Sequence, residues 1–200
     1  MKKIVKAAKS KSTKKASTAK RPEIFTPKTF GQALSQAEKL MPMLDSGKLS
    51  DSQVRTRVDK FMVNSDTVRG FCIVLLTGDF KTSDRFPAAM VKSMRKGSPA
   101  VFEVMAKNVV MAPTMAVTHR RNKDADAAAG SDRCTERAVK LIHLINSADM
   151  TTQLQEMQQA FRGEESAYRA FVLNWKYLDD ADQVKAGLDA LEKALETKKS

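Results

Sequence analysis

Residues 98–118, SPAVFEVMAKNVVMAPTMAVT, form the longest apolar segment of the chain and decide its fold class. Plotted at about 100° per residue, the apolar side chains of this segment cover roughly two-thirds of a helical circumference. Glu103, Lys107, Thr114 and Thr118 fall on one narrow polar strip. A helix with so little polar surface is buried on most sides. The segment therefore predicts the central helix of an all-α domain, with the other helices packed around it.

The start and the interior of this helix carry recognisable signals. The hydroxyl of Ser98 can accept from a first-turn N–H, and Pro99 suits the first helical position, where no donor is needed. The pattern therefore predicts that Ser98 caps the helix. Pro113 lies inside the periodic run, where it removes the hydrogen bond to the carbonyl of Val109. We expect a kink near Pro113.

One polar residue interrupts the apolar arc of the segment. If the carboxamide of Asn108 is buried, we expect it to bond to a neighbouring helix or to the backbone that the proline frees. The first interpretation is a satisfied core residue beside methionines that fill irregular gaps. The alternative is a ligand pocket at the kink, lined by Asn108, Met111 and Met115.

Amphipathic helical patterns fill most of residues 23–200, and no convincing strand or repeat occurs. The apolar run GFCIVLL, residues 70–76, could be a strand, but it has no partner strand and lies between helical patterns of similar length. We interpret it as a buried helix in which Gly70 allows a close helix contact. Residues 119–132, HRRNKDADAAAGSD, predict a loop, and we expect Ser131 to cap the helix after it. The count is about eight or nine helices in one compact domain.

The charge of the chain is concentrated at its N-terminus. The 35 basic and 23 acidic residues give a net charge of +12, but residues 1–22 hold nine basic residues and no acid. The rest of the chain has 26 basic and 23 acidic residues, a balance of only +3. The basic arm is defined by its nine basic residues, which are Lys2, Lys3, Lys6, Lys9, Lys11, Lys14, Lys15, Lys20 and Arg21.

The composition of residues 1–22 predicts disorder and an anionic partner, which can be nucleic acid, an acidic protein or an anionic membrane surface. Lys, Ala, Ser and Thr dominate this segment, and it has almost nothing apolar to bury. A flexible cationic segment can neutralise phosphates and release condensed counterions without a fixed geometry, so its binding is salt-sensitive and largely blind to sequence. In composition the segment resembles the basic arms of linker histones and of similar chromatin or ribosomal proteins.

Basic residues of the folded part extend the candidate nucleic-acid interface. One group follows the central segment and another shares a predicted helix face at spacings of three and four residues. They are Arg120, Arg121, Lys123, Arg133, Arg137 and Lys140. Each cluster can also be a solvated helix face that local acids balance.

Several function classes lack their sequence signals. No GxxxxGK[ST] or GxGxxG pattern occurs, and two histidines and two separated cysteines form no recognisable metal motif. We therefore expect no catalytic residues, no metal, no cofactor and no enzyme activity. The scarcity of cysteine indicates a reducing environment, and no apolar run approaches the 18–20 residues of a membrane span. Together with the absence of an apolar signal region, these features predict a cytoplasmic protein without a transmembrane segment. The alternative is that the acid-free arm, with its Ser and Thr residues, is an organellar transit peptide, but its Lys rather than Arg content counts against this.

The sequence supports three functional hypotheses. The first is a non-enzymatic helical protein whose basic arm binds DNA or RNA electrostatically and with little specificity. The second is a helical regulatory or adaptor protein that binds another protein through a groove between helices, with the arm as an accessory. The third, which ranks below them, is a helical ligand-binding protein or enzyme that uses the pocket beside Pro113.

Overall fold

The computed structural model describes residues 23–196, and residues 1–22 and 197–200 lie outside the described part. Within the described residues the chain forms ten α-helices and one short 3-10 helix, and no strand. The predicted all-α single domain is confirmed. The predicted disorder of the arm falls on residues outside the described part. The helix count exceeds the prediction because two of the helices, α4 and α9, have only five and six residues.

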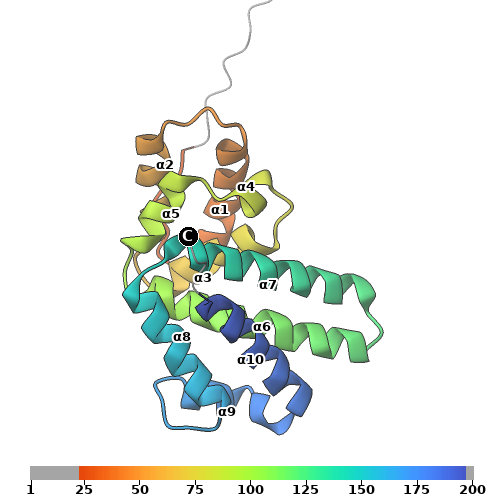
Figure 1. Ribbon diagram of the computed structural model, residues 1–200. Helices are drawn as coiled ribbons and strands as arrows, with labels where there is room; N and C mark the ends of the chain where they lie inside the picture. The colour runs from red at the N-terminus through yellow and green to blue at the C-terminus, as the bar shows by residue number, and fades with distance from the viewer. Residues whose placement is uncertain (1–22, 197–200) are drawn as a thin grey trace, which may run out of the picture.

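The first five helices form one end of the molecule (Figure 1). The long helices α1 and α3 pack against each other, α2 packs against α5, and the short α4 contacts both α1 and α3. Their bounds are Phe30–Asp45 for α1, Asp51–Val58 for α2, Ser65–Thr77 for α3, Lys81–Arg85 for α4 and Ala88–Arg95 for α5. Helix α3 contains the run GFCIVLL, so the helical interpretation of that run is confirmed.

The remaining helices surround α6, which runs across the middle of the molecule (Figure 1). Helix α6 packs against α7, α10, α8 and α3. The bounds are Ala100–Arg121 for α6, Ala125–Ile145 for α7, Ala148–Phe161 for α8, Arg169–Asn174 for α9, Tyr177–Asp179 for η1 and Ala181–Leu195 for α10. Val101, Met105 and Val109 on α6 are completely buried. The predicted central helix is therefore confirmed.

The prediction that Ser98 caps this helix is wrong. Helix α6 begins at Ala100 with Pro99 as its cap residue, and no side chain bonds to its first turn. The Ser98 hydroxyl is buried, with no partner among residues 23–196. Its backbone N–H donates to the carbonyl of Met62 at 3.2 Å. This contact holds Ser98 against the segment that follows α2, and tertiary packing overrides the local cap signal.

Helix α6 continues through Pro113 to Arg121. Just beyond the proline, the hydroxyl of Thr114 donates to the carbonyls of Val110 at 3.0 Å and Met111 at 2.9 Å. Such back-bonding from a buried threonine satisfies a polar side chain inside the helix packing. The proline therefore lies within one long helix.

The predicted loop over residues 119–132 is wrong, and so is the cap at Ser131. Helix α7 already begins at Ala125, because the Asp124 carboxylate caps it by accepting from the N–H of Ala127 at 3.0 Å. The chain reverses between α6 and α7 in three residues, with Lys123 in the left-handed conformation at a φ of 58°. Three successive alanines with high helix propensity outweigh Gly130. As a result, α6 and α7 form a long helical hairpin (Figure 1).

Gly70 occupies a close contact between α1 and α3, as the sequence predicted. A Cβ atom added at Gly70 would lie 2.6 Å from the Cβ of Ala33 and 2.9 Å from the carbonyl oxygen of Phe30. Neither neighbour is the end of a flexible side chain. The absence of a side chain at Gly70 is therefore required by the packing of α1 on α3.

Candidate basic surface and ligand groove

Arg137 belongs to the predicted nucleic-acid interface, but the structure places its side chain inside the fold. The residue is 9% exposed. Its Nε donates to Oδ1 of Asp84 at 2.8 Å, and its Nη1 donates to the carbonyls of Leu76 and Gly78, both at 2.9 Å. These carbonyls lie at the C-terminal end of α3, where helical backbone acceptors lack intrahelical partners. Arg137 therefore joins α7 to α3 and α4, and we leave it out of the proposed interface.

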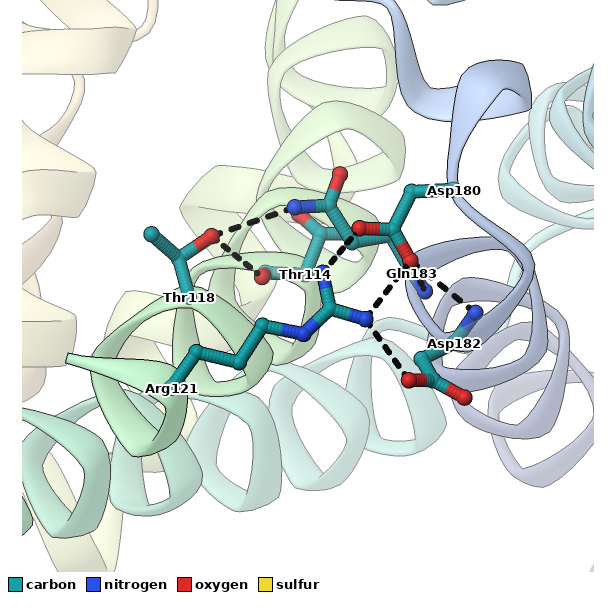
Figure 2. A network of polar contacts seen from close by, with 6 residues as sticks. All are labelled: Thr114, Thr118, Arg121, Asp180, Asp182 and Gln183. Atoms are coloured by element: carbon teal, nitrogen blue, oxygen red, sulfur yellow. Dashed lines mark hydrogen bonds and ion pairs between the residues drawn. The ribbon is translucent and has the colours of Figure 1, made fainter. Parts of the chain in front are cut away.

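Arg121 is held by two carboxylates at the start of α10 (Figure 2). Its Nη1 contacts Oδ2 of Asp180, while its Nη2 donates to Oδ1 of Asp180 at 3.0 Å and to Oδ2 of Asp182 at 2.6 Å. The guanidinium lowers the pKa of Asp180 below its usual value, against the opposing effect of desolvation. A phosphate would have to compete with both acids for Arg121.

The same junction contains a second set of polar contacts (Figure 2). The side-chain amide of Gln183 donates to the hydroxyl of Thr118 at 3.1 Å, and that hydroxyl donates to the carbonyl of Thr114 at 3.4 Å. Asp180 also caps α10, accepting from the N–H of Asp182 at 3.1 Å and of Gln183 at 3.2 Å. The network ties the C-terminal end of α6 to the N-terminal end of α10.

The other basic residues predicted for the interface differ in their exposure and in their ion pairs. Arg120 pairs with Asp132 at 2.6 Å, but both side chains are about half exposed, so this pair contributes little and can exchange with solvent ions. Lys140 is exposed, and its Nζ donates to the backbone carbonyl of Asp84. Lys123 and Arg133 are exposed and make no ion pair with any residue in 23–196.

Acidic residues offset much of the charge at the α6–α7 turn. Asp124, Asp126 and Asp132 lie on the turn and on the first part of α7, and Asp180 and Asp182 reach it from α10. The sequence places Arg120, Arg121 and Lys123 together, and the structure keeps them at one end of the hairpin. The five carboxylates outnumber these three basic residues, so this end of the hairpin carries no net positive charge.

The basic arm lies outside the described residues, but the place where the chain enters the fold is defined. Ile24 is 3% exposed, and the Nζ of Lys60 donates to its carbonyl oxygen. The backbone N–H of Phe25 donates to the side chain of Gln36 at 3.3 Å. These contacts hold the entry point beside α1 and the end of α2. The neighbouring helix α2 carries the exposed Arg55.

A groove of about 370 Å³ opens between α6 and α7. Helix α6 contributes Asn108, Met111, Ala112, Met115 and His119 to its walls. The opposite wall comes from α7 and the end of α3, through Ala127, Gly130, Ser131, Cys134 and Thr77. The three residues that the sequence assigns to a candidate pocket therefore lie in one groove, and ligand binding there stays a prediction.

The expectation that a buried Asn108 carboxamide finds a partner is wrong for its nitrogen. Its Nδ2 is buried and has no hydrogen-bond partner within residues 23–196. The carbonyl of Val109, which Pro113 frees, does not supply one, since the Asn108 nitrogen makes no hydrogen bond within residues 23–196. Buried polar groups normally have partners, so an unpartnered amide nitrogen in the wall of a groove is unusual.

The α7 side of the groove was missed because residues 119–132 have the composition of a loop. Once the segment is helical, Ala127, Gly130, Ser131 and Cys134 fall on one face at spacings of three and four residues. Small side chains on this face leave room opposite the methionines. The signal was present in the sequence as the run AAAGS after a capping aspartate.

The chemistry of the groove is mainly apolar and uncharged. Burial raises the pKa of the Cys134 thiol to about 11, although the charge of Arg137 opposes the shift. At neutral pH this thiol is therefore protonated and a weak nucleophile. Met115 is 40% exposed, so an apolar thioether faces the open groove. Among residues 23–196, no group of three or more His, Cys, Asp or Glu side chains is arranged to hold a metal ion.

Helix α6 is also long and apolar enough, by length and composition alone, to cross a membrane. It is the one such helix in the described part of the chain, and 61% of its most apolar window is buried in the fold. A core helix of a helical domain has the same composition. The absence of a membrane-spanning segment stays a prediction.

The fold and these features define an all-α domain with a groove in its central hairpin. The chain belongs to the family described as uncharacterised conserved protein UCP020893, which matches residues 29–194. That match covers nearly all of the helical part, from α1 into the last turn of α10, and begins after the basic arm. No curated protein and no solved structure is significantly similar to the chain.

Proposed function

We propose that this protein binds nucleic acid electrostatically through its basic arm, residues 2–21, and so tethers the helical domain to DNA or RNA. The observation that carries the proposal is the charge distribution. Nine basic residues and no acid occupy the arm, whereas the rest of the chain is almost balanced. A charge density of this kind favours phosphate backbones, because each neutralised phosphate releases condensed counterions.

The surroundings of the basic residues in the folded part support binding through the basic arm. Arg137 is buried and cannot contact a phosphate, and at Arg121 a phosphate must compete with two carboxylates. Arg120, Lys123, Arg133 and Lys140 are exposed and can add weaker contacts that orient the domain. Phosphate contacts position a protein on nucleic acid without specifying a sequence, so we expect little sequence preference.

The proposal is tested by fluorescence anisotropy with a labelled DNA duplex and a structured RNA. The full chain is compared with a variant in which all nine basic residues of the arm are replaced by Gln. We expect binding by the full chain at low salt, weaker binding at moderate salt, and loss of binding by the neutralised variant with an unchanged circular dichroism spectrum. Absence of binding by the full chain at low salt would refute the proposal.

A matched control separates the arm from the folded surface. Replacing Arg120, Lys123, Arg133 and Lys140 by Gln removes four exposed charges and leaves the arm intact. We expect this variant to retain most of the affinity, because acids already offset the charge of that region. An affinity loss as large as that of the neutralised arm would move the interface to the α6–α7 hairpin.

A second candidate function is that of an adaptor that binds another protein. The observation that favours it is the exposure of two large apolar side chains at the end of α9, Leu173 at 49% and Trp175 at 54%. Aromatic residues of this kind are common at the centres of protein interfaces. If the protein is an adaptor, replacing both residues by Ser should abolish binding of the partner protein, and the variant with the neutralised arm should still bind it. Partner binding that is lost with the arm charges and kept by the Ser variant would support the nucleic-acid proposal.

A further inference from the structure

The groove between α6 and α7 has the size and the wall chemistry of a small-molecule site. Its volume of about 370 Å³ falls within the range of ligand pockets. Met115 lines the groove and is 40% exposed at its open side. Methionine side chains adapt to ligands of different shape, because they are flexible and polarizable.

The walls favour an uncharged ligand. No Asp, Glu, Lys or Arg of the described residues lines the groove, and the Cys134 thiol is protonated at neutral pH. Apart from the imidazole of His119, the walls offer a charged ligand no partner of opposite charge, so such a ligand would lose its hydration for little gain. The groove therefore suits a molecule with a mainly apolar body.

Asn108 supplies the polar contact that such a site needs. Its Nδ2 lies in the groove wall with no partner among the described residues. Rotation about the Cβ–Cγ bond would turn this nitrogen from its buried position toward the open side of the groove. A ligand acceptor can then satisfy the donor that the fold leaves unpaired.

We propose that the α6–α7 groove binds an uncharged, mainly apolar small molecule that presents one carbonyl-type acceptor to the Asn108 amide. This inference goes beyond nucleic-acid binding and does not depend on the basic arm. It explains why the polar residue Asn108 lies in the apolar arc of the central helix and why its amide nitrogen has no partner among residues 23–196.

The proposal predicts opposite effects of one substitution on stability and on binding. Asn108→Leu replaces the amide by an apolar group of similar shape and removes an unpaired buried donor, so the fold should keep or gain thermal stability. The same change removes the hydrogen bond to the ligand carbonyl. An asparagine retained for packing or for an undetected internal bond would instead lose stability on substitution.

The binding test uses the full chain and the neutral dye N-phenyl-1-naphthylamine as a fluorescent reporter. Acetophenone and isopropylbenzene are the competitors, because they are similar in shape and differ mainly in the carbonyl group. The ratio of their affinities is compared between the wild type and Asn108→Leu, so that the difference in their hydrophobicity cancels. We expect the acetophenone-to-isopropylbenzene affinity ratio to fall about tenfold in the variant.

A second variant keeps the test decisive if Asn108→Leu does not fold. Gly130 lies in the groove wall, and a Cβ added there would meet only a guanidinium nitrogen of Arg133 at 3.9 Å. Gly130→Leu should therefore fold, occupy part of the groove and weaken dye binding. The proposal is overturned if the wild type does not bind the dye, if Gly130→Leu binds it equally well, or if the competitor ratio is the same in the wild type and Asn108→Leu.

Discussion

Arg137 tests whether the structure correctly separates basic residues that stabilise the fold from those that are exposed at the surface. It shares α7 with Arg133, four residues earlier, and the sequence pattern predicts the same role for both. The structure separates them, because Arg133 is exposed whereas Arg137 is 9% exposed and bonds to Asp84 and to two carbonyls of the α3 end. We predict that Arg137→Met destabilises the fold strongly and that Arg133→Met does not.

The size of the effect follows from the three contacts of Arg137. Its loss leaves the buried carbonyl of Leu76 without its guanidinium donor, which costs about 1–3 kcal/mol. The carbonyl of Gly78 is only partly buried and adds less. The side chain of Asp84 is 64% exposed and can be rehydrated, so the ion pair adds at most about 1 kcal/mol. We expect a total loss of about 2–4 kcal/mol in the free energy of unfolding.

Urea unfolding monitored by circular dichroism measures this difference. With the slope typical of small proteins, Arg137→Met should lower the transition midpoint by roughly 1–2 M. Arg133→Met should stay within about 0.5 kcal/mol of the wild type, as is usual for exposed positions. Equal stability of the two variants would contradict the structural role of Arg137.

Three further predictions concern other positions. Gly130→Ala should raise the free energy of unfolding by about 1 kcal/mol, because Gly130 lies inside α7 with open space around it. Gly70→Ala should lower the free energy of unfolding by about 1–3 kcal/mol, because the added Cβ would clash with α1, and urea unfolding measures both effects. Burial acts to raise the pKa of Asp45, but hydrogen bonds from Thr82 and from the Lys81 N–H outweigh it and leave the pKa below 3.8. Since the pKa of Asp45 is lowered in the folded state, its ionised carboxylate stabilises the fold above the ordinary pKa, and this stabilisation is lost as the pH falls through the folded-state pKa. Asp45→Asn should therefore have a lower melting temperature than the wild type at pH 7, and the two melting temperatures should converge in acid. Asp180→Asn can still cap α10 but loses its charge beside Arg121, so its melting temperature should fall more at low salt than at high salt.

The features that depend on long apolar periodicity could be predicted from the sequence. The central helix was recognisable because the apolar residues of 98–118 leave so little polar surface. The close contact at Gly70 was recognisable because a glycine inside a buried helical run lowers helix propensity and is tolerated where a neighbouring backbone approaches. Both are properties of one segment and do not require knowledge of the partner helix.

Features that depend on tertiary contacts could not be predicted. Ser98 has the sequence of a helix cap, but its backbone bond to Met62 fixes the chain in another position. Arg137 differs from Arg133 only through the carbonyls of α3 that it reaches. The lack of a partner for the Asn108 nitrogen within residues 23–196 becomes visible only when the surroundings of its amide are known.

The start of α7 was predictable in principle. Asp124 followed by Ala-Asp-Ala-Ala-Ala has both a cap and high helix propensity. The polar and small composition of residues 119–132 masks this pattern. The same error hid one wall of the groove.

The salt dependence of binding tests the central claim most directly. For the full chain on a DNA duplex, the logarithm of the binding constant should fall linearly with the logarithm of the salt concentration, with a slope near −0.9 for each phosphate that the arm neutralises. Engagement of most of the nine arm charges predicts a slope of about −5 to −8, and neutralisation of the arm should remove it. A shallow slope for the full chain, or an equally steep slope without the arm charges, would contradict tethering by the arm.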